Sequence, residues 1–298
     1  MRSLDMRKLV LILLILSCFV MAGQRVSADK IIDQINAGQK VEYVNKIIVG
    51  SLDFTELKDM RQVNSSFGRH EEYASIVEVP IYFKDCNFKG EVLGYKYVND
   101  EYDTYRADFQ ANVTFQNCDF KDKTEFKHSD FEEKAIFTNC SFSEEANFKH
   151  SNFEESCDFS GSTFNKEANF KHASMDEKTS FDKAVFEEEA NFKYTDFSHN
   201  AKFVSANFQD EGNFKHTSFS GPAIFKKAYF SEDANFKYAS FSDHTDFSEC
   251  TIAGFTNFEH TDFCQDLVFK GTKFNGNIDA DHARIRGGSF TKFLLENK

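Results

Sequence analysis

A large apolar side chain recurs along most of this chain in steps that alternate between five and six residues. The rhythm is set by Phe109, Phe115, Phe120, Phe126, Phe131 and Phe137, and it continues to Phe274. Two positions before each one the residue is usually small, as at Ala146, and the residue between is usually Asn, Asp or Ser. In an extended segment the small and large side chains share one face. The pattern therefore predicts short strands with inward Phe, and it fits no helical period.

A five-residue motif, Ala146–Asn147–Phe148–Lys149–His150, returns at a constant interval, beginning again at Ala168, Ala190, Gly212 and Ala234. Segments that are only half of that interval apart have different sequences. One turn of the predicted coil therefore has about 22 residues and four sides. Each segment is too short to be stable alone. We therefore expect each segment to pair in parallel with its copy one turn on, about 4.8 Å away, with the Phe rings stacked inside.

These motifs resemble those of the pentapeptide-repeat family, whose consensus is A-(D/N)-(L/F)-x-x. Ala146–Asn147–Phe148–Lys149–His150 matches it at every position, and the resemblance covers about residues 107–290. It implies an all-β fold, a right-handed quadrilateral β-helix. Every second corner here carries an extra residue, which departs from the family's 20-residue turn and favours a slightly rectangular coil of about 22 residues. About eight turns at about 4.8 Å each give a rod roughly 40 Å long.

The ends of the chain depart from the repeat. Residues 29–106 contain a predicted short helix from Asp29 to Ala37, followed by strand-like segments at 47–49 and 52–54. We interpret residues 29–106 as an N-terminal cap with interrupted first coils, because the exposed end of a solenoid must be covered. The β-helix is expected over 107–290, and a C-terminal cap or tail over 291–298. The N-terminal part looks like that of secreted members of the family.

Residues 1–28 have the pattern of a secretory signal peptide. Three basic residues and an apolar run come first: Arg2, Arg7, Lys8 and Leu9–Leu16. Val26 and Ala28 supply small residues before a cleavage site near Ala28. The pattern predicts a secreted or cell-surface protein with no membrane span after signal removal. Two alternatives stay open: a retained anchor, although the run is short for a spanning helix, or lipidation of Cys18 in an imperfect lipobox.

Composition narrows the possible functions. The chain has 37 Phe, no Trp and a formal net charge of −13. An acidic surface repels phosphates, so direct nucleic-acid binding is not expected. The sequence contains no nucleophile elbow, phosphate loop, HExxH or CxxC motif. We therefore expect no catalytic residues and no cofactor, and the protein is not expected to be an enzyme.

Charge is sorted by corner. One short corner carries the residues that we call the Lys–aromatic edge: Lys149, His150, Lys171, His172, Lys193, Tyr194, Lys215 and His216. The long corners on either side are mostly acidic, as at Glu144–Glu145 and Glu154–Glu155. One interpretation is a solvated, charge-compensated rod. The other is a striped docking face for an unknown protein or cell-surface partner.

Two residue types could carry further chemistry. His128, His150 and His172 stand on successive turns and could share a Zn²⁺ or Cu²⁺ ion, but Tyr194 and Tyr238 in the same slot favour simple stacking. Five cysteines occupy the small inward slot: Cys86, Cys118, Cys140, Cys157 and Cys250. Buried free thiols are one interpretation. A disulfide between Cys118 and Cys140 is the other, although parallel geometry would strain it.

Three functional hypotheses follow. The first is a non-enzymatic, exported rod that acts as a structural or protein-binding module. The second rests on the resemblance, because some family members are acidic DNA mimics that inhibit a topoisomerase. The third is a metal- or ligand-binding surface on the His edge. The sequence predicts neither the partner nor the oligomeric state, since fold alone does not give function.

Overall fold

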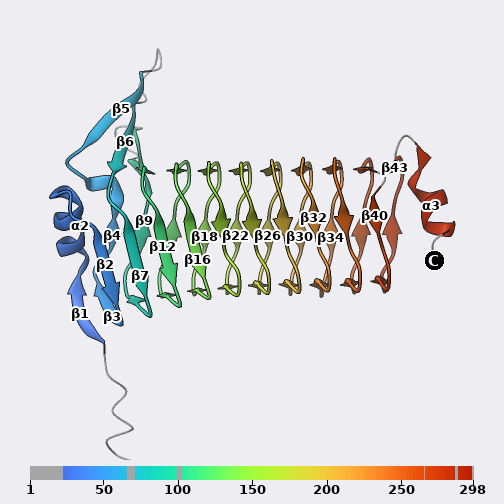
Figure 1. The fold of residues 1–298 in the computed structure, drawn as a ribbon, viewed down its shortest axis with the longest axis horizontal. Helices are drawn as coiled ribbons and strands as arrows, with labels where there is room; N and C mark the ends of the chain where they lie inside the picture. The colour runs from blue at the N-terminus through green and yellow to red at the C-terminus, as the bar shows by residue number, and fades with distance from the viewer. Residues whose placement is uncertain (1–22, 66–70, 99–102, 265, 286–287, 297–298) are drawn as a thin grey trace, which may run out of the picture.

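The short strands predicted from the Phe spacing form four parallel sheets that run the length of a rod (Figure 1). The computed structural model describes residues 23–65, 71–98, 103–264, 266–285 and 288–296. One coil passes through the four sheets in turn, so each strand pairs with its copy one coil later, as Ala146 does with Ala168. The all-β, four-sided coil with a turn of about 22 residues is therefore confirmed.

The first two faces are joined by a short corner. The first face contains β2 (Val41–Val44), β7 (Ile81–Lys84), β12 (Val113–Gln116), β16 (Ala135–Thr138), β20 (Cys157–Asp158), β24 (Thr179–Ser180), β28 (Ala201–Lys202), β32 (Ala223–Ile224), β36 (Thr245–Asp246) and β40 (Leu267–Val268). The second contains β1 (Gln24–Ser27), β3 (Lys46–Val49), β8 (Asn87–Phe88), β13 (Asp119–Phe120), β17 (Ser141–Phe142), β21 (Thr163–Phe164), β25 (Val185–Phe186), β29 (Asn207–Phe208), β33 (Tyr229–Phe230), β37 (Thr251–Ile252) and β41 (Lys273–Phe274).

The other two faces are joined by the second short corner. The third face contains β4 (Leu52–Asp53), β9 (Val92–Leu93), β14 (Thr124–Glu125), β18 (Ala146–Asn147), β22 (Ala168–Asn169), β26 (Ala190–Asn191), β30 (Gly212–Asn213), β34 (Ala234–Asn235), β38 (Thr256–Asn257) and β42 (Ile278–Asp279). The fourth contains β5 (Met60–Ser65), β6 (Glu71–Val77), β11 (Asp103–Phe109), β15 (Asp130–Phe131), β19 (Asn152–Phe153), β23 (Ser174–Met175), β27 (Asp196–Phe197), β31 (Ser218–Phe219), β35 (Ser240–Phe241), β39 (Asp262–Phe263), β43 (Arg284–Ile285) and β44 (Gly288–Ser289).

The core is a set of Phe ladders. Phe192 is fully buried, and its ring stacks on Phe170 at 5.1 Å below and on Phe214 at 5.0 Å above. Rings from neighbouring faces meet edge to face, as Phe192 meets Phe203 at 5.4 Å and 86°. Both arrangements are favoured by the ring quadrupole. The small residue two positions earlier, Ala190, is also fully buried and leaves room for the rings.

The N-terminal end is closed by β1 and by α2 (Ala28–Asn36). Ile31 and Ile35 of this helix are buried against the first coil, which agrees with the predicted helix and cap. The predicted signal peptide lies mostly outside the described residues. Residues 23–28 are described: Gly23 precedes β1, residues 24–27 form β1 and Ala28 is the first residue of α2. Residues 52–54 were predicted to form one strand. In the structure the strand ends at Asp53, because the Asp53 side chain accepts a hydrogen bond from the Thr55 N–H and caps η1 (Phe54–Glu56).

Insertions in the first two coils broaden the fourth face. β5 pairs antiparallel with β6, and β10 (Tyr95–Val98) pairs antiparallel with β11, which itself lies parallel to β6. These four strands, which we call the lateral sheet, extend from the N-terminal end of the rod (Figure 1). At the other end, β44 turns back on β43, and α3 (Phe290–Glu296) covers the last coil with Phe290 buried. No helix in the described ranges is long and apolar enough to cross a membrane.

The Lys–aromatic edge, a candidate functional site

The corner between the third and fourth faces is built by the repeated motif. In one copy, the Asn147 side-chain oxygen accepts the Lys149 N–H at 3.1 Å, and the Phe148 carbonyl accepts the Ser151 N–H at 3.1 Å. These bonds close a turn whose third residue, His150, has φ of 60°. Asn is favoured before such turns because its side chain bonds the backbone two residues on. The motif thus directs Phe148 inward and holds the Lys149–His150 corner at the surface.

The aromatic residues of this corner stack into one continuous column. We define the ring column as Tyr95, His128, His150, His172, Tyr194, His216, Tyr238, His260 and His282. From His128 onward the ring centroids are 4.6–4.8 Å apart and the rings are nearly parallel, while Tyr95 is tilted at 5.5 Å. The predicted straight column from residue 128 to 260 is confirmed.

Two members of the ring column were missed from the sequence. His282 follows His260 by one coil, so the 22-residue spacing could have found it. Tyr95 offers no such signal, because it lies in β10, an insertion that breaks the spacing before His128. Tyr95 nevertheless extends the column onto the lateral sheet, and the Lys127 ammonium lies 4.6 Å from its ring centre.

A second column, of lysines, runs beside the rings. Lys193 lies 5.1 Å from the Tyr194 ring centre, and Lys237 lies 5.4 Å from that of Tyr238. Such cation–π contacts hold the ammonium groups against the edge. Among the described residues no carboxylate forms an ion pair with Lys149, Lys171 or Lys215, so these positive charges face solvent between the acidic corners.

Four imidazoles of the ring column, those of His128, His150, His172 and His216, resist protonation. Burial, followed by the neighbouring His128 and His172, lowers the pKa of His150 to about 4. Burial also lowers the pKa of His128, His172 and His216, and the adjacent lysines add to the effect. At neutral pH these four rings are therefore uncharged, and the positive charge beside them belongs to the lysines.

The stack also argues against the metal hypothesis for His128, His150 and His172. Their rings lie face to face with interplanar angles of 3° and 4°. Ring nitrogens bond a metal in the plane of the ring, so parallel stacked rings direct their lone pairs side by side and not toward one shared ion. Within the described ranges, no group of three His, Cys, Asp or Glu side chains is placed to hold a metal.

Carboxylates border the edge on both sides. On the third face, Glu189 and Glu211 accept hydrogen bonds from Asn213 and Asn235 at 3.1 and 3.2 Å. Burial, then the adjacent Glu189 and Glu145, raises the pKa of Glu167. On the fourth face, Asp196 stands two residues beyond Tyr194. The Lys–aromatic edge is therefore a narrow positive stripe within an acidic surface.

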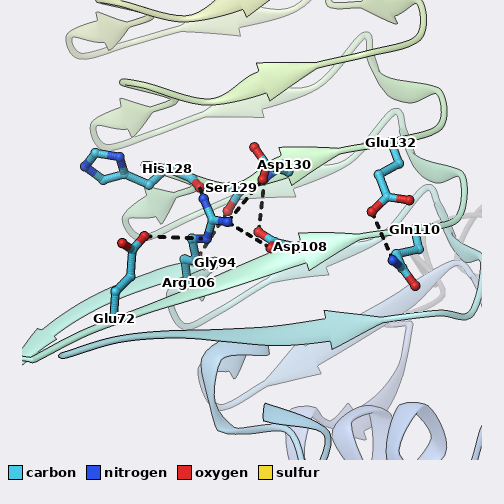
Figure 2. A network of polar contacts seen from close by, with 9 residues as sticks. All are labelled: Glu72, Gly94, Arg106, Asp108, Gln110, His128, Ser129, Asp130 and Glu132. Atoms are coloured by element: carbon cyan, nitrogen blue, oxygen red, sulfur yellow. Dashed lines mark hydrogen bonds and ion pairs between the residues drawn. The ribbon is translucent and has the colours of Figure 1, made fainter. Parts of the chain in front are cut away.

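A half-buried ion cluster anchors the start of the edge. Figure 2 shows the Arg106 guanidinium between Glu72 on one side and Asp108 and Asp130 on the other. Arg106 Nη2 lies 3.2 Å from both aspartates, and Nε lies 3.7 Å from Glu72. Nη1 donates to the His128 carbonyl at 3.1 Å. Burial raises the pKa of Asp108 to about 6, and Arg106 opposes this shift. The cluster ties the lateral sheet to the coil that carries His128.

The inward cysteines are free thiols in this structure. The Cys118 thiol donates to the Phe83 carbonyl at 3.6 Å, and the Cys140 thiol to the Phe115 carbonyl at 3.4 Å. Burial raises the pKa of Cys157 and of Cys250 to about 12. These groups are placed as small core residues that bond the coil beneath them, and Cys118 and Cys140 form no disulfide.

The chain folds as a four-sided parallel β-helix built from short Phe-centred segments. The family model described as pentapeptide repeats (9 copies) matches residues 126–174, 170–218 and 214–262. The chain therefore belongs to the pentapeptide-repeat family, as its motifs indicated. No curated protein and no solved structure matches it. The family assignment accounts for the rod and leaves the edge to be explained from its own residues.

Proposed function

We propose that this protein is a non-enzymatic, exported rod that binds an acidic partner protein through its Lys–aromatic edge. The observation that carries the proposal is the ring column, which gives one corner the same stacked geometry over successive coils. Its neighbours Lys149, Lys171 and Lys215 repeat at the same pitch. A rigid row of equally spaced cations gives a complementary acidic surface many contacts in a single geometry.

The chemistry of the ring column also favours an anionic partner. Each ring face is covered by the next ring, so only ring edges reach solvent. The edge of an aromatic ring is the positive part of its quadrupole, and a neutral imidazole adds one N–H donor. Ring edges and lysines therefore both suit carboxylates. Flat sugar faces would need open ring faces, which the stack does not offer.

We infer that the protein has no catalytic activity from the contacts that its buried carboxylates and thiols make. The two most buried carboxylates in the described part, Asp108 and Glu125, are paired with Arg106 and Lys123. The inward thiols bond backbone carbonyls within the core. These groups make contacts that stabilise the fold, whereas catalytic groups would have to be accessible to a substrate.

Export is inferred from the N-terminal pattern. The competing hypothesis, an acidic DNA mimic that inhibits a topoisomerase, requires a cytoplasmic protein whose carboxylates stand in for phosphates. The lysine row interrupts the acidic surface along one corner of this rod, from Lys127 to Lys237. This interruption supports a striped docking face over a uniform polyanion.

A charge-reversal experiment tests the docking face. The edge variant carries Lys149→Glu, Lys171→Glu and Lys215→Glu. The control variant carries Lys178→Glu, Lys183→Glu and Lys202→Glu, which are exposed on other parts of the same coils. Both variants change the net charge equally. The probe is a fluorescent deca-glutamate peptide, followed by anisotropy at low and high salt.

We expect the parent protein to bind the peptide in a salt-sensitive manner. The edge variant should bind at least about tenfold more weakly, or about 1.4 kcal/mol, while the control variant should keep most of its affinity. Equal weakening in the two variants would mean that only net charge matters. No binding by the parent protein would reject an acidic partner for the edge.

A further inference from the structure

The start of the folded rod lies earlier than the cleavage point expected from the signal pattern. All four residues of β1 pair in parallel register with β3, from Gln24 with Lys46 to Ser27 with Val49. The Gln24 side chain accepts a hydrogen bond from the Lys46 ammonium at 3.0 Å. Val26 is 8% exposed and Ala28 is 1% exposed. These residues belong to the rod in the same sense as the strands that follow.

Cleavage after Ala28 would cut into two elements at once. It would remove β1, and it would leave the edge of β3 beside the buried Ile48 without its covering strand. It would also place a new positively charged amine at Asp29, in the first turn of α2. A cation at a helix N-terminus opposes the helix dipole. A mature chain that began at Asp29 would therefore lose part of its cap.

Gly23, the residue before β1, also lies against the first coil. A side chain added there would place its Cβ 3.0 Å from the Asn45 carbonyl oxygen, so the backbone of residue 23 already lies close against the first coil. The residues just before it in the sequence are Val20, Met21 and Ala22, which follow the apolar run. Val20 and Ala22 supply the −3 and −1 residues that a signal peptidase recognises.

We propose that signal removal occurs between Ala22 and Gly23, so that the mature protein keeps β1. Water hydrolyses the Ala22–Gly23 peptide bond and leaves a carboxylate on Ala22 and an amine on Gly23. The inference rests on the proposed export, and it moves the processing point to a bond that leaves Gly23 and β1 in the mature chain. Signal cleavage can precede folding. The position of the cleaved bond is therefore limited by which residues the mature protein needs in order to fold.

The test is the N-terminal sequence and intact mass of the full-length chain expressed in a secreting bacterium. Ala22→Arg places a large charged residue at −1 of the proposed bond. Asp29→Pro is the matched control at the other bond, since a proline is tolerated in the first turn of a helix. We expect exported protein that begins at Gly23, loss of processing in Ala22→Arg, and an unchanged N-terminus in Asp29→Pro.

The other outcomes are distinct. Exported protein that begins at Asp29 would overturn this inference and leave the proposed export intact. A lipid-modified N-terminus at Cys18 would likewise overturn the Ala22–Gly23 bond as the processing site. An intact Met1 on cytoplasmic protein would overturn export itself and return the DNA-mimic hypothesis. The same mass spectrum separates all four results.

Discussion

At the residue scale, each position of the repeated motif has one physical task. Ala146 is buried beside the rings, Asn147 bonds the turn, Phe148 fills the core and His150 joins the outer stack. Substitutions at these positions differ in how much they lower the free energy of unfolding, because a core ring loses both burial and its stacked neighbours. Surface members lose contacts on one side only. Single substitutions can therefore separate the core from the edge.

Truncation of Phe192 tests the core. Phe192→Ala removes a fully buried ring between Phe170 and Phe214, and it should lower the free energy of unfolding by about 3–5 kcal/mol. Phe255→Ala is the control, because Phe255 is 38% exposed on a corner. Chemical denaturation followed by circular dichroism measures both. A loss at residue 192 no larger than that at residue 255 would contradict the ladder.

The ring column should make the rod sensitive to acid. The pKa of His150 is lowered to about 4 in the folded state, below the ordinary value of 6.5. The unfolded chain therefore binds more protons between these values, and stability falls as pH drops from about 6.5 toward 4. His150→Tyr should reduce this loss relative to the parent protein, since Tyr194 already occupies the same slot of the column. Unfolding midpoints at pH 7 and pH 5 provide the comparison.

At the element scale, the sequence predicts the regular coils and not the joints between unlike elements. The Phe steps predict every face of the repeat, because side chain and backbone share one period. The Arg106 cluster has no such signal. Glu72 lies in β6 and Arg106 in β11, and the two meet because these long strands pair in parallel, with Glu72 beside Thr104. The length of an insertion does not reveal its register, so Tyr95 and the cluster could not be predicted.

Removal of the central cation should loosen the lateral sheet. Arg106→Met leaves Asp108 and Asp130 near each other without a cationic partner, which should cost about 3–5 kcal/mol at pH 7. Burial raises the pKa of both aspartates, that of Asp108 to about 6. Protonation relieves the repulsion, so the cost should shrink as pH falls from 7 toward 5.

Hydrogen exchange of residues 95–98 and 103–106 reports on this sheet directly. Arg61→Met is the control, because the ion pairs of Arg61 with Asp59 and Glu78 are exposed, and such pairs contribute about 0–1 kcal/mol. If protection of the lateral sheet in Arg106→Met is unchanged at pH 7, the cluster does not hold the sheet.

At the scale of the whole molecule, the rod is a one-dimensional stack whose stability is a sum over neighbouring coils. The register is strict, since Ala168 pairs with Ala190 and Asn169 with Asn191. The length of any change in the chain therefore matters more than its location. A whole coil can be removed without disturbing the faces, while a shorter removal shifts every later side chain.

Two deletions test this statement. Deletion of residues 168–189 removes one coil and joins Glu167 to Ala190, so the small inward slot is still filled by alanine. Deletion of 168–187, the 20-residue turn of the family consensus, places Glu188 in that slot. We expect the first variant to unfold cooperatively at a slightly lower temperature and the second to fail to fold. Circular dichroism melts decide, and equal behaviour would contradict a fixed 22-residue coil.

The closed ends of the rod have a consequence for crowded protein solutions. A parallel sheet that stops without a cover is a template onto which another chain can add, coil upon coil. Here β1 lies over β3, β44 turns back on β43, and α2 and α3 lie over the two end coils. The rod is therefore an array of coils of fixed length, with a capping element at each end. If the proposed export is correct, loss of β1 would leave the edge of β3 uncovered, and the bond at which the leader is removed would then also set how readily one rod adds to another.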